Sequence, residues 1–294
     1  MSSLPYKSFA ILGAAGSIGR YIFDALHERN ASILAITCSS SSSTDALPSD
    51  VKVAKVDDYK NVEAVAAVLR ANRIEVVICA FTWQSVEAIY VEETALADAA
   101  RAAGVKLFVP SEYGLFTEGA PESLWETKDN VAEYMIGIEL PTARFFTGIF
   151  FSWISGLSGY PSTGKINVLG TGRTLVSWTA TEDVGSFISH VLTTLPPAEL
   201  NDGIFRIEGE RLSWEDVATR MGAPITSVEK VAADSESLTR LCAVLQRMVE
   251  EGSGSMGWDS AAKKEGTERA RSANSLWSGH VWKKVPCDVL ATTV

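Results

Sequence analysis

The stretch that most constrains the fold of this chain lies in residues 8–26. An apolar run over residues 8–12 is followed at once by a turn in which Gly13, Gly16 and Gly19 recur every third residue. Apolar side chains then recur at helical spacing, at Ile18, Tyr21, Ile22, Ala25 and Leu26. A strand, a glycine-rich turn and a helix in this order form the unit that binds a dinucleotide pyrophosphate.

Each of the three glycines has its own physical role in such a unit. Gly13 permits the tight turn, Gly16 lets backbone N–H groups approach the phosphates, and Gly19 lets the helix pack closely on the strand. The free N–H groups and the positive end of the helix dipole then face the anion. We expect cofactor contacts from Gly13, Ala15, Gly16, Ser17, Ile18 and Gly19, the alternative being a purely structural turn.

Strands and helices alternate through the first half of the chain. After the strand at 8–12 we expect strands at 33–37, 51–56, 76–80, 105–109 and 142–146. Between them we expect helices at 61–71, 86–103 and 123–138, and Gly104 is expected to end the second of these. This alternation predicts an α/β fold of the Rossmann type, a doubly wound parallel sheet with helices on both faces.

The alternation stops after residue 151. Residues 153–178 are rich in Gly, Ser and aromatic residues, and a helix is expected from Thr181 to just before Pro196. Further on, Ser213 and Asp216 have the spacing of a capping box at the start of another helix.

The length of 294 residues fits one nucleotide-binding domain with a smaller attached lobe. We expect the NAD(P)-binding domain to comprise residues 1–152 and to be completed by about 179–208. Residues 153–178 and 209–294 are then expected to form the C-terminal substrate-binding lobe.

Composition excludes several functional classes. The net charge of −10 argues against nucleic-acid binding. The longest apolar stretch, residues 140–157, contains Pro141 and Arg144 and reads as a buried strand running into a loop rather than a membrane span. The four cysteines and three histidines lack the spacing of a metal site. We expect a cytoplasmic protein without a structural metal, either a monomer or a homodimer.

The end of the second predicted strand bears on the choice of cofactor. No Asp or Glu occurs between residues 29 and 44, where a carboxylate would bind the ribose 2′-hydroxyl of NADH and repel the 2′-phosphate of NADPH. Cys38, Ser39 and Ser40 lie there instead. This favours NADPH over NADH, although the arginine expected for a 2′-phosphate is also missing and the serines equally suit a plain loop.

Ligands of open parallel sheets bind beyond the carboxyl ends of the strands. Phe81 and Thr82 follow the fourth strand, and Ser111 follows the fifth, so we expect these three side chains near the ribose or nicotinamide. An aromatic wall for a flat apolar substrate is expected from Trp83, Tyr113, Trp125, Phe150, Phe151 and Trp178, the alternative for each being ordinary core packing.

Hydride transfer leaves negative charge on the substrate, so a proton donor is needed. In this chain no tyrosine is followed four residues later by lysine, so the usual donor of short-chain dehydrogenases is missing. Lys128 lies early in the helix after the fifth strand, where a cation is unfavourable for the helix dipole. Beside a cofactor and apolar walls its pKa would fall toward a useful range, the alternative being a solvated helix lysine.

The segment 105–114 reads Val-Lys-Leu-Phe-Val-Pro-Ser-Glu-Tyr-Gly and is similar to a Lys-Arg-Phe-x-Pro-Ser-Glu-Phe-Gly segment, with Tyr113 in place of phenylalanine. With the glycine turn, Lys128 and residues 181–185, it makes the chain resemble the isoflavone-reductase-like and NmrA-like atypical short-chain dehydrogenases/reductases. The resemblance covers residues 8 to about 218.

The resemblance implies an NADPH-dependent reductase of phenolic, enone or other apolar secondary metabolites, with Lys128 as the general acid. Two departures stand out: Cys38 occupies roughly the place of an arginine for the 2′-phosphate, and Asp129, Asn130 and Glu133 replace basic residues. The family also contains redox sensors that bind NADP(H) without catalysis, which is the alternative function. An isomerase or epimerase is disfavoured by the missing Tyr-x-x-x-Lys pair.

Overall fold

The computed structural model describes residues 4–39, 47–80, 85–119, 123–231, 235–259 and 262–291. The chain divides into two compact units. The first unit comprises Met1–Glu112, Thr117–Phe145 and Val184–Phe205, and the second comprises Tyr113–Phe116, Phe146–Asp183 and Arg206–Val294.

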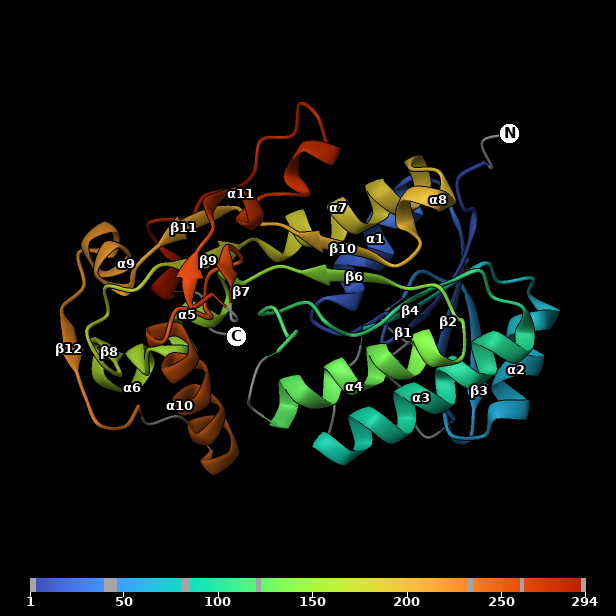
Figure 1. Cartoon of the computed structure of the whole chain (residues 1–294), viewed down its shortest axis with the longest axis horizontal. Helices are drawn as coiled ribbons and strands as arrows, with labels where there is room; N and C mark the ends of the chain where they lie inside the picture. The colour runs from blue at the N-terminus through green and yellow to red at the C-terminus, as the bar shows by residue number, and fades with distance from the viewer. Residues whose placement is uncertain are drawn as a thin grey trace. The chain divides into compact units, whose positions relative to one another are not determined.

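A five-stranded parallel sheet forms the centre of the first unit (Figure 1). Its strands are β1 (Ser8–Leu12), β2 (Ser32–Cys38), β3 (Lys52–Val56), β4 (Val76–Cys79) and β5 (Leu107–Val109). Their order, β3-β2-β1-β4-β5, confirms the predicted doubly wound fold. The order reverses between β1 and β4, and the crevice at their carboxyl ends is where such sheets bind ligands.

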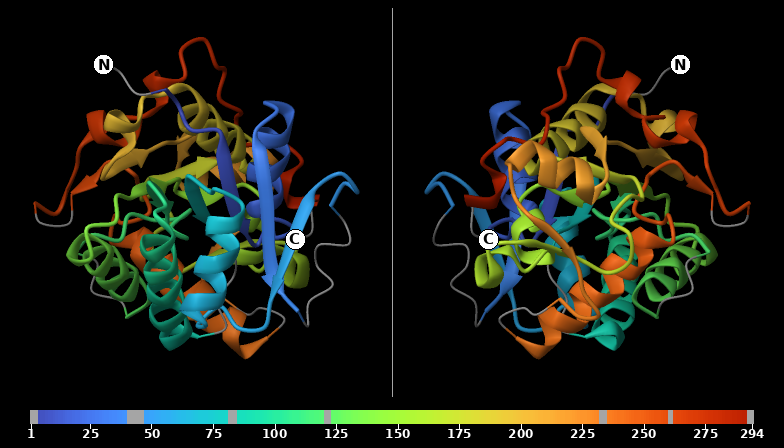
Figure 2. Two further views of the ribbon diagram at one scale, coloured as in Figure 1. Left: turned by 90° about the vertical axis from the view of Figure 1, so that its right-hand side faces the viewer. Right: turned by 90° about the vertical axis from the view of Figure 1, so that its left-hand side faces the viewer.

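Helices of the first unit cover this sheet. They are α1 (Gly19–Glu28), α2 (Val62–Ala71), α3 (Val86–Ala103), α4 (Ser123–Gly137), most of α7 (Thr181–Thr194) and the short α8 (Pro197–Leu200). Figures 1 and 2 show α2, α3 and α4 side by side, and their apolar faces pack with the strands in one buried cluster. Alternate β1 side chains, such as Ala10 and Leu12, point into that cluster because strand side chains alternate between faces.

Local capping fixes where these helices begin and end. The side chain of Asn61 accepts from the N–H of Ala64 at 3.1 Å, and Ser85 accepts from Ala88 at 3.1 Å. Gly104 has a φ of +79° and ends α3 in the left-handed conformation, as predicted. These caps set the register of α3, the helix whose buried face reaches the candidate site.

The strand expected at 142–146 forms, but it does not continue the sheet. β6 (Ala143–Phe146) shares a two-stranded sheet with β10 (Gly203–Arg206), and a single bridge, Phe108 to Thr142, joins this segment to β5. The expected sixth strand of the parallel sheet is thus present only as this one parallel bridge beside β5, without a ladder of its own. β5 is only three residues long and is followed by Pro110, which has no N–H to extend a ladder.

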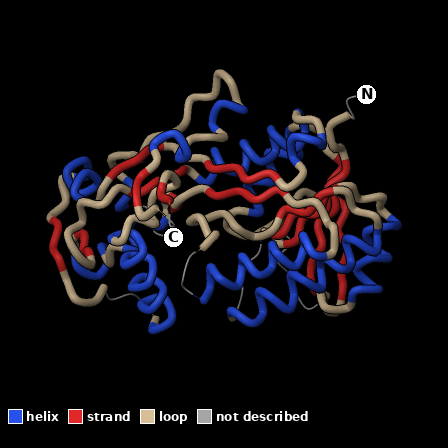
Figure 3. The backbone as a smooth tube through the Cα atoms, viewed as in Figure 1, coloured by secondary structure: helices blue, strands red, loops and turns tan. Residues whose placement is uncertain are grey.

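The second unit contains short strands and helices (Figure 3). Its strands are β7 (Ile149–Phe150), β8 (Ile166–Val168), β9 (Val176–Thr179), β11 (Glu210–Leu212), β12 (Ile225–Ser227), β13 (Trp258–Asp259) and β14 (Lys264–Glu265). Its helices are α5 (Trp153–Leu157), α6 (Tyr160–Thr163), α9 (Trp214–Met221), α10 (Glu236–Glu250) and α11 (Thr267–Ala270), with single 3-10 turns at Asn274–Leu276 and Val289–Ala291.

Two features of the second unit bear on the sequence predictions. The capping box of α9 is confirmed, since Ser213 accepts from the N–H of Asp216 and the Asp216 carboxylate accepts from the N–H of Ser213. The Gly-, Ser- and aromatic-rich stretch 153–178, for which no helix or strand was predicted, contains α5, α6, β8 and most of β9. Over the residues that the structure describes, no helix has the length and apolarity needed to cross a membrane.

Candidate functional site

The backbone of the turn after β1 requires glycine at positions 13 and 19. Gly13 has a φ of +83°, which side-chain-bearing residues rarely adopt, and the N–H of Gly16 donates to its carbonyl oxygen at 2.8 Å. A Cβ on Gly19 would lie 1.9 Å from that oxygen. The first turn of α1 therefore packs on the loop in a way that only glycine allows, and this bare backbone fits a pyrophosphate.

The loop also borders the end of β4. A Cβ on Gly16 would lie 3.1 Å from the Gly13 carbonyl oxygen and 3.4 Å from that of Ala80. Ile18 is the N-cap residue of α1 and has no side-chain group that caps the helix. An apolar N-cap leaves the helix terminus to an external anion. Around the turn, Ala15 is half-buried, Ser17 is exposed and Ile18 is buried.

At the end of β2, the structure adds a carboxylate that the sequence prediction did not include. Ser39 donates its hydroxyl proton to Asp57, at 2.8 Å, just beyond the end of β3. The half-buried Cys38 lies beside Tyr59, whose pKa is raised well above its usual range by burial and by this thiol. Asp57 follows β3, the neighbouring strand, and therefore lies outside residues 29–44, the segment in which the sequence analysis looked for an acidic residue. Ser40, Phe81, Thr82 and Trp83 lie outside the described residues.

The amine of Lys128 is bound by the backbone that follows β5. Its Nζ donates to the carbonyl oxygen of Ser111 at 2.6 Å and to that of Glu112 at 3.0 Å. Lys128 lies on α4, and its amine reaches the segment that precedes this helix in the chain. The predicted lysine therefore lies at the carboxyl end of β5, the edge of the sheet at which ligands bind.

The two carbonyls orient the amine in either protonation state. A protonated amine has three N–H donors, so one remains for a substrate, whereas a neutral amine with both N–H groups used presents its lone pair. Burial lowers the pKa of Lys128, and the negative charges of Glu112 and Glu93 oppose that shift. Lowering the pKa of a lysine toward neutrality suits it to proton transfer.

Glu93 lies behind this segment and was not singled out from the sequence. It is 1 % exposed on α3, and its carboxylate accepts the N–H of Ser111 at 2.8 Å. Burial raises its pKa to about 7, opposed by the Ser111 hydrogen bond and the charge of Lys128. Glu93 could have been found in the sequence because it follows Ile89 by four positions, which places a carboxylate on the otherwise apolar face of the helix.

A buried arginine completes the surroundings of the lysine. Arg144 on β6 forms ion pairs of 2.8 Å with Glu112 and Asp129, and it donates to the hydroxyl of Thr117 at 2.7 Å. The carboxylates raise the pKa of Arg144 against the effect of burial. Asp129, which departs from the basic pattern implied by the resemblance, therefore neutralises an internal arginine. In the described part of the chain, the second carboxylate oxygen of Glu112 is buried and has no hydrogen-bond partner.

The predicted aromatic wall is distributed over both units. Trp125 in the first unit is buried at the start of α4, and Phe150 in the second unit is half-buried. Tyr113 and Phe151, also in the second unit, are each 8 % exposed. Trp178 is fully buried, donates its indole N–H to Leu212 at 3.1 Å and packs edge-on against Trp214. The rings of Tyr113, Phe151 and Trp178 are thus mostly covered by protein.

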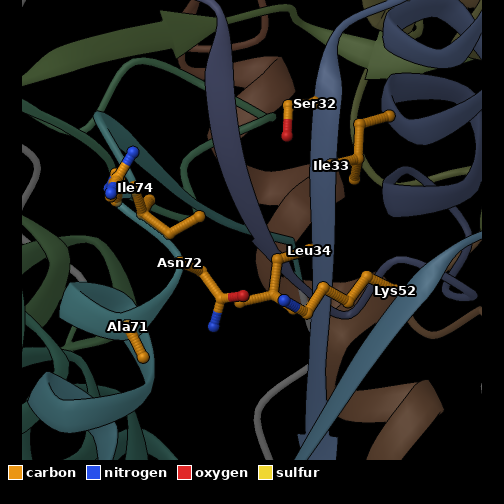
Figure 4. A pocket seen from close by; sticks show the side chains of 8 residues that line it. Ser32, Ile33, Leu34, Lys52, Ala71, Asn72 and Ile74 are labelled. Carbon is orange, nitrogen blue, oxygen red and sulfur yellow. The ribbon is translucent and has the colours of Figure 1, made fainter.

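A hollow of about 260 Å³ lies elsewhere in the first unit (Figure 4). It is lined by the starts of β2 and β3, including Ser32 and Lys52, and by the end of α2 around Asn72. These are the amino ends of the strands, away from the glycine turn, so we do not assign it to the cofactor. Among the described residues, no three His, Cys, Asp or Glu side chains are grouped so as to hold a metal ion.

Comparison with known proteins decides the family. The model of the NmrA-like family matches residues 5–256, which is most of the chain. The chain belongs to the NmrA-like family. The resemblance drawn from the glycine turn, the 105–114 segment and Lys128 is thereby confirmed. The family match covers the first unit from residue 5 onward and much of the second unit.

Individual relatives of this NmrA-like chain are distant. "Oxidoreductase BOA1" of Botryotinia fuckeliana (strain B05.10) is 28 % identical over 235 residues, 72 % of this chain and 74 % of the relative. The fold is similar to AtPrR2 with NADP+ and (+)pinoresinol, with a TM-score of 0.77 and 16 % identity over the whole of both chains. It is also similar to the binary complex of leucoanthocyanidin reductase and NADPH from Vitis vinifera, with a TM-score of 0.75, 18 % identity and coverage of 94 % and 96 %.

Proposed function

We propose that this chain is an NADPH-dependent reductase that transfers hydride to a small apolar substrate, with Lys128 as the general acid. The observation that supports this best is the double hydrogen bond from the Lys128 amine to the backbone after β5, in the unit that contains the glycine turn. The name of the relative as an oxidoreductase supports the reaction class. The NADP+ and NADPH of the structural neighbours support the choice of cofactor.

NADPH supplies a hydride when bound. The backbone of the glycine turn and the N-terminus of α1 would hold its pyrophosphate, with Ala15, Ser17 and Ile18 beside it. Cys38, Ser39 and Ser40 would face the adenosine end, and Phe81, Thr82 and Ser111 the nicotinamide end. The fit rests on the observed turn, in which a Cβ at Gly19 would collide with the Gly13 carbonyl.

Lys128 would supply the proton that balances the reduction. Hydride arrival at a carbonyl or activated double bond leaves negative charge, and the third N–H of a protonated Lys128 is available to neutralise it. The amine returns to the protonated form by taking a proton from solvent. Because its pKa is lowered by burial, the lysine gives up a proton more readily than an exposed lysine does.

The substrate class is proposed to be phenolic, enone or another apolar secondary metabolite. Tyr113, Trp125, Phe150 and Phe151 remain the proposed substrate contacts, together with Trp83. Trp178 is fully covered by its neighbours, so we propose that it packs β9 against Trp214 of α9 and does not touch substrate. A cytoplasmic location remains a prediction, testable by microscopy of a tagged chain.

Consumption of NADPH by the purified protein tests the proposal. A panel of phenols, enones and quinones is offered with NADPH and, separately, with NADH, and the loss of reduced cofactor is followed by absorbance. We expect turnover above background with at least one member, and faster turnover with NADPH. Binding of NADPH without turnover of any member would instead indicate the redox-sensor function and overturn the reductase proposal.

A further inference from the structure

We propose that Glu93 is the positioning residue for Lys128: it fixes the peptide that binds the lysine amine and supplies the negative charge that keeps this amine protonated. The inference rests on the proposed role of Lys128 as general acid, and it adds the group that controls the protonation of that acid. Glu93 itself would touch neither substrate nor cofactor.

The geometric part of the proposal is a relay through one residue. The Glu93 carboxylate accepts the N–H of Ser111 at 2.8 Å, and the carbonyl of Ser111 accepts from the Lys128 amine at 2.6 Å. Ser111 is therefore bonded on both sides, to α3 through its N–H and to α4 through its carbonyl. A carboxylate is a stronger acceptor for a backbone N–H than a neutral group, so this link restrains the segment from which the amine is bound.

The electrostatic part of the proposal depends on which charged groups near Lys128 already form ion pairs with one another. The Lys128 amine is acted on by Glu93, Glu112 and Arg144. Arg144 forms its ion pairs with Glu112 and with Asp129, which offset its positive charge. Glu93 faces Lys128, the Cys79 thiol of β4 and the charge of Glu112. Its carboxylate is thus the negative charge near Lys128 that is not in an ion pair with Arg144.

The two groups titrate as a pair. Burial raises the pKa of Glu93 to about 7 and lowers that of Lys128. As the pH rises through neutrality, Glu93 loses its proton first, and its new negative charge then increases the proton affinity of Lys128. This order keeps the general acid charged over a pH range in which burial alone would favour its neutral form.

Competitive acylation of Lys128 tests the inference without relying on turnover. The purified, cofactor-free protein is treated with trace acetic anhydride at a series of pH values, and acetylation of the Lys128 peptide is quantified by mass spectrometry. Only the neutral amine reacts, so the curve gives the pKa of Lys128. We expect Glu93→Gln, which keeps the size and an acceptor oxygen, to lower this pKa by about one unit, a tenfold change in proton affinity.

Glu92→Gln is the matched control, because it removes the same charge from the neighbouring position on α3, and it is expected to leave the curve unchanged. Glu93→Asp keeps the charge and should restore most of the wild-type pKa of Lys128. If Glu93→Gln does not fold, we expect the pKa of Lys128 in Glu93→Asp to lie below the wild-type value. Unchanged curves in both Glu93 variants would overturn the proposal. Because the readout is acylation, this outcome is distinct from a failure to find any reductase substrate.

Discussion

The Lys128 amine lies 2.6 Å from the carbonyl oxygen of Ser111, so a helix residue and the residue two positions after β5 meet at one hydrogen bond. The glycine turn borders the end of β4, which pairs with β5 in the same sheet. The proposed proton donor and the proposed pyrophosphate-binding turn therefore both lie at the carboxyl ends of strands in one sheet. Such placement on sheet ends is how functional groups keep a fixed geometry.

Removing the amine tests the role of Lys128 directly. Lys128→Ala is expected to abolish turnover and to change the Kd for NADPH less than about threefold, or roughly 0.65 kcal/mol. The cofactor is expected to bind through backbone groups that this substitution leaves in place. Lys106→Ala is the control, since Lys106 pairs with Glu75 just before β5, at the opposite edge of the sheet. Retained turnover, or loss of NADPH binding measured by calorimetry, would contradict the assignment.

A methyl group in the glycine turn should weaken the binding of NADPH. Gly19→Ala places a Cβ 1.9 Å from the Gly13 carbonyl oxygen, so the start of α1 must shift. We expect the affinity for NADPH to fall at least tenfold, about 1.4 kcal/mol. Gly137→Ala near the end of α4 meets nothing within 4 Å and serves as the control. Equal NADPH affinities in the two variants, measured by fluorescence titration, would exclude the turn as the binding site.

The carboxylate of Asp57 should weaken discrimination in favour of NADPH. It accepts a hydrogen bond from the Ser39 hydroxyl at 2.8 Å beside the end of β2, where its negative charge would repel a bound 2′-phosphate. Asp57→Asn is expected to raise the NADPH-to-NADH affinity ratio about fivefold, corresponding to roughly 1 kcal/mol of repulsion in a solvated site. Asp50→Asn, an exposed change at the other end of β3, should leave the ratio unaltered. A ratio that falls in Asp57→Asn would show that the carboxylate favours the phosphate.

Local patterns were sufficient to predict most elements of the first unit, because these elements are determined by nearby residues. The strand at 8–12, the glycine turn and the end of α3 at Gly104 each depend on periodicity or on a backbone conformation that one residue type adopts. The family likewise followed from short motifs. Lys128 lies on the helix that follows β5, as expected, and its catalytic role stays a prediction.

Contacts between distant elements could not be predicted in this way. Ser39 and Asp57 are 18 residues apart, as are Glu93 and Ser111, and each pair is brought together by strand order or helix packing. Arg144 lay in a segment interpreted only as a buried strand, so its ion pair with Glu112, 32 residues earlier, was not anticipated. A single sequence contains no signal for these pairings until the topology is known.

Titration of Glu93 should make stability depend on pH. Its pKa of about 7 in the folded protein exceeds the ordinary 4.5, so the folded state binds more protons between these values and the free energy of unfolding falls as pH rises through them. The loss is on the order of 1–3 kcal/mol and is complete above about pH 8. Glu93→Gln should lack this slope in urea titrations, and Glu92→Gln should keep it. Parallel slopes in wild type and Glu93→Gln would rule out the raised pKa.

Removing the charge of Arg144 should lower the free energy of unfolding far more than breaking a surface ion pair does. The Glu112 side chain is only 2 % exposed, so Arg144→Met leaves a buried carboxylate without its partner, at a cost of about 3–5 kcal/mol. Arg101→Ala breaks an exposed pair with Glu139 and should cost less than about 1 kcal/mol.

The double variant Arg144→Met with Glu112→Gln separates an orphaned charge from lost packing. If the orphaned carboxylate causes the loss, neutralising it recovers most of the stability, and the two substitutions are strongly non-additive in urea denaturation. Asp129 also pairs with Arg144 but is 22 % exposed, so water partly solvates it when the arginine is removed. Recovery should therefore depend on Glu112, and additive losses would instead assign the role of Arg144 to packing.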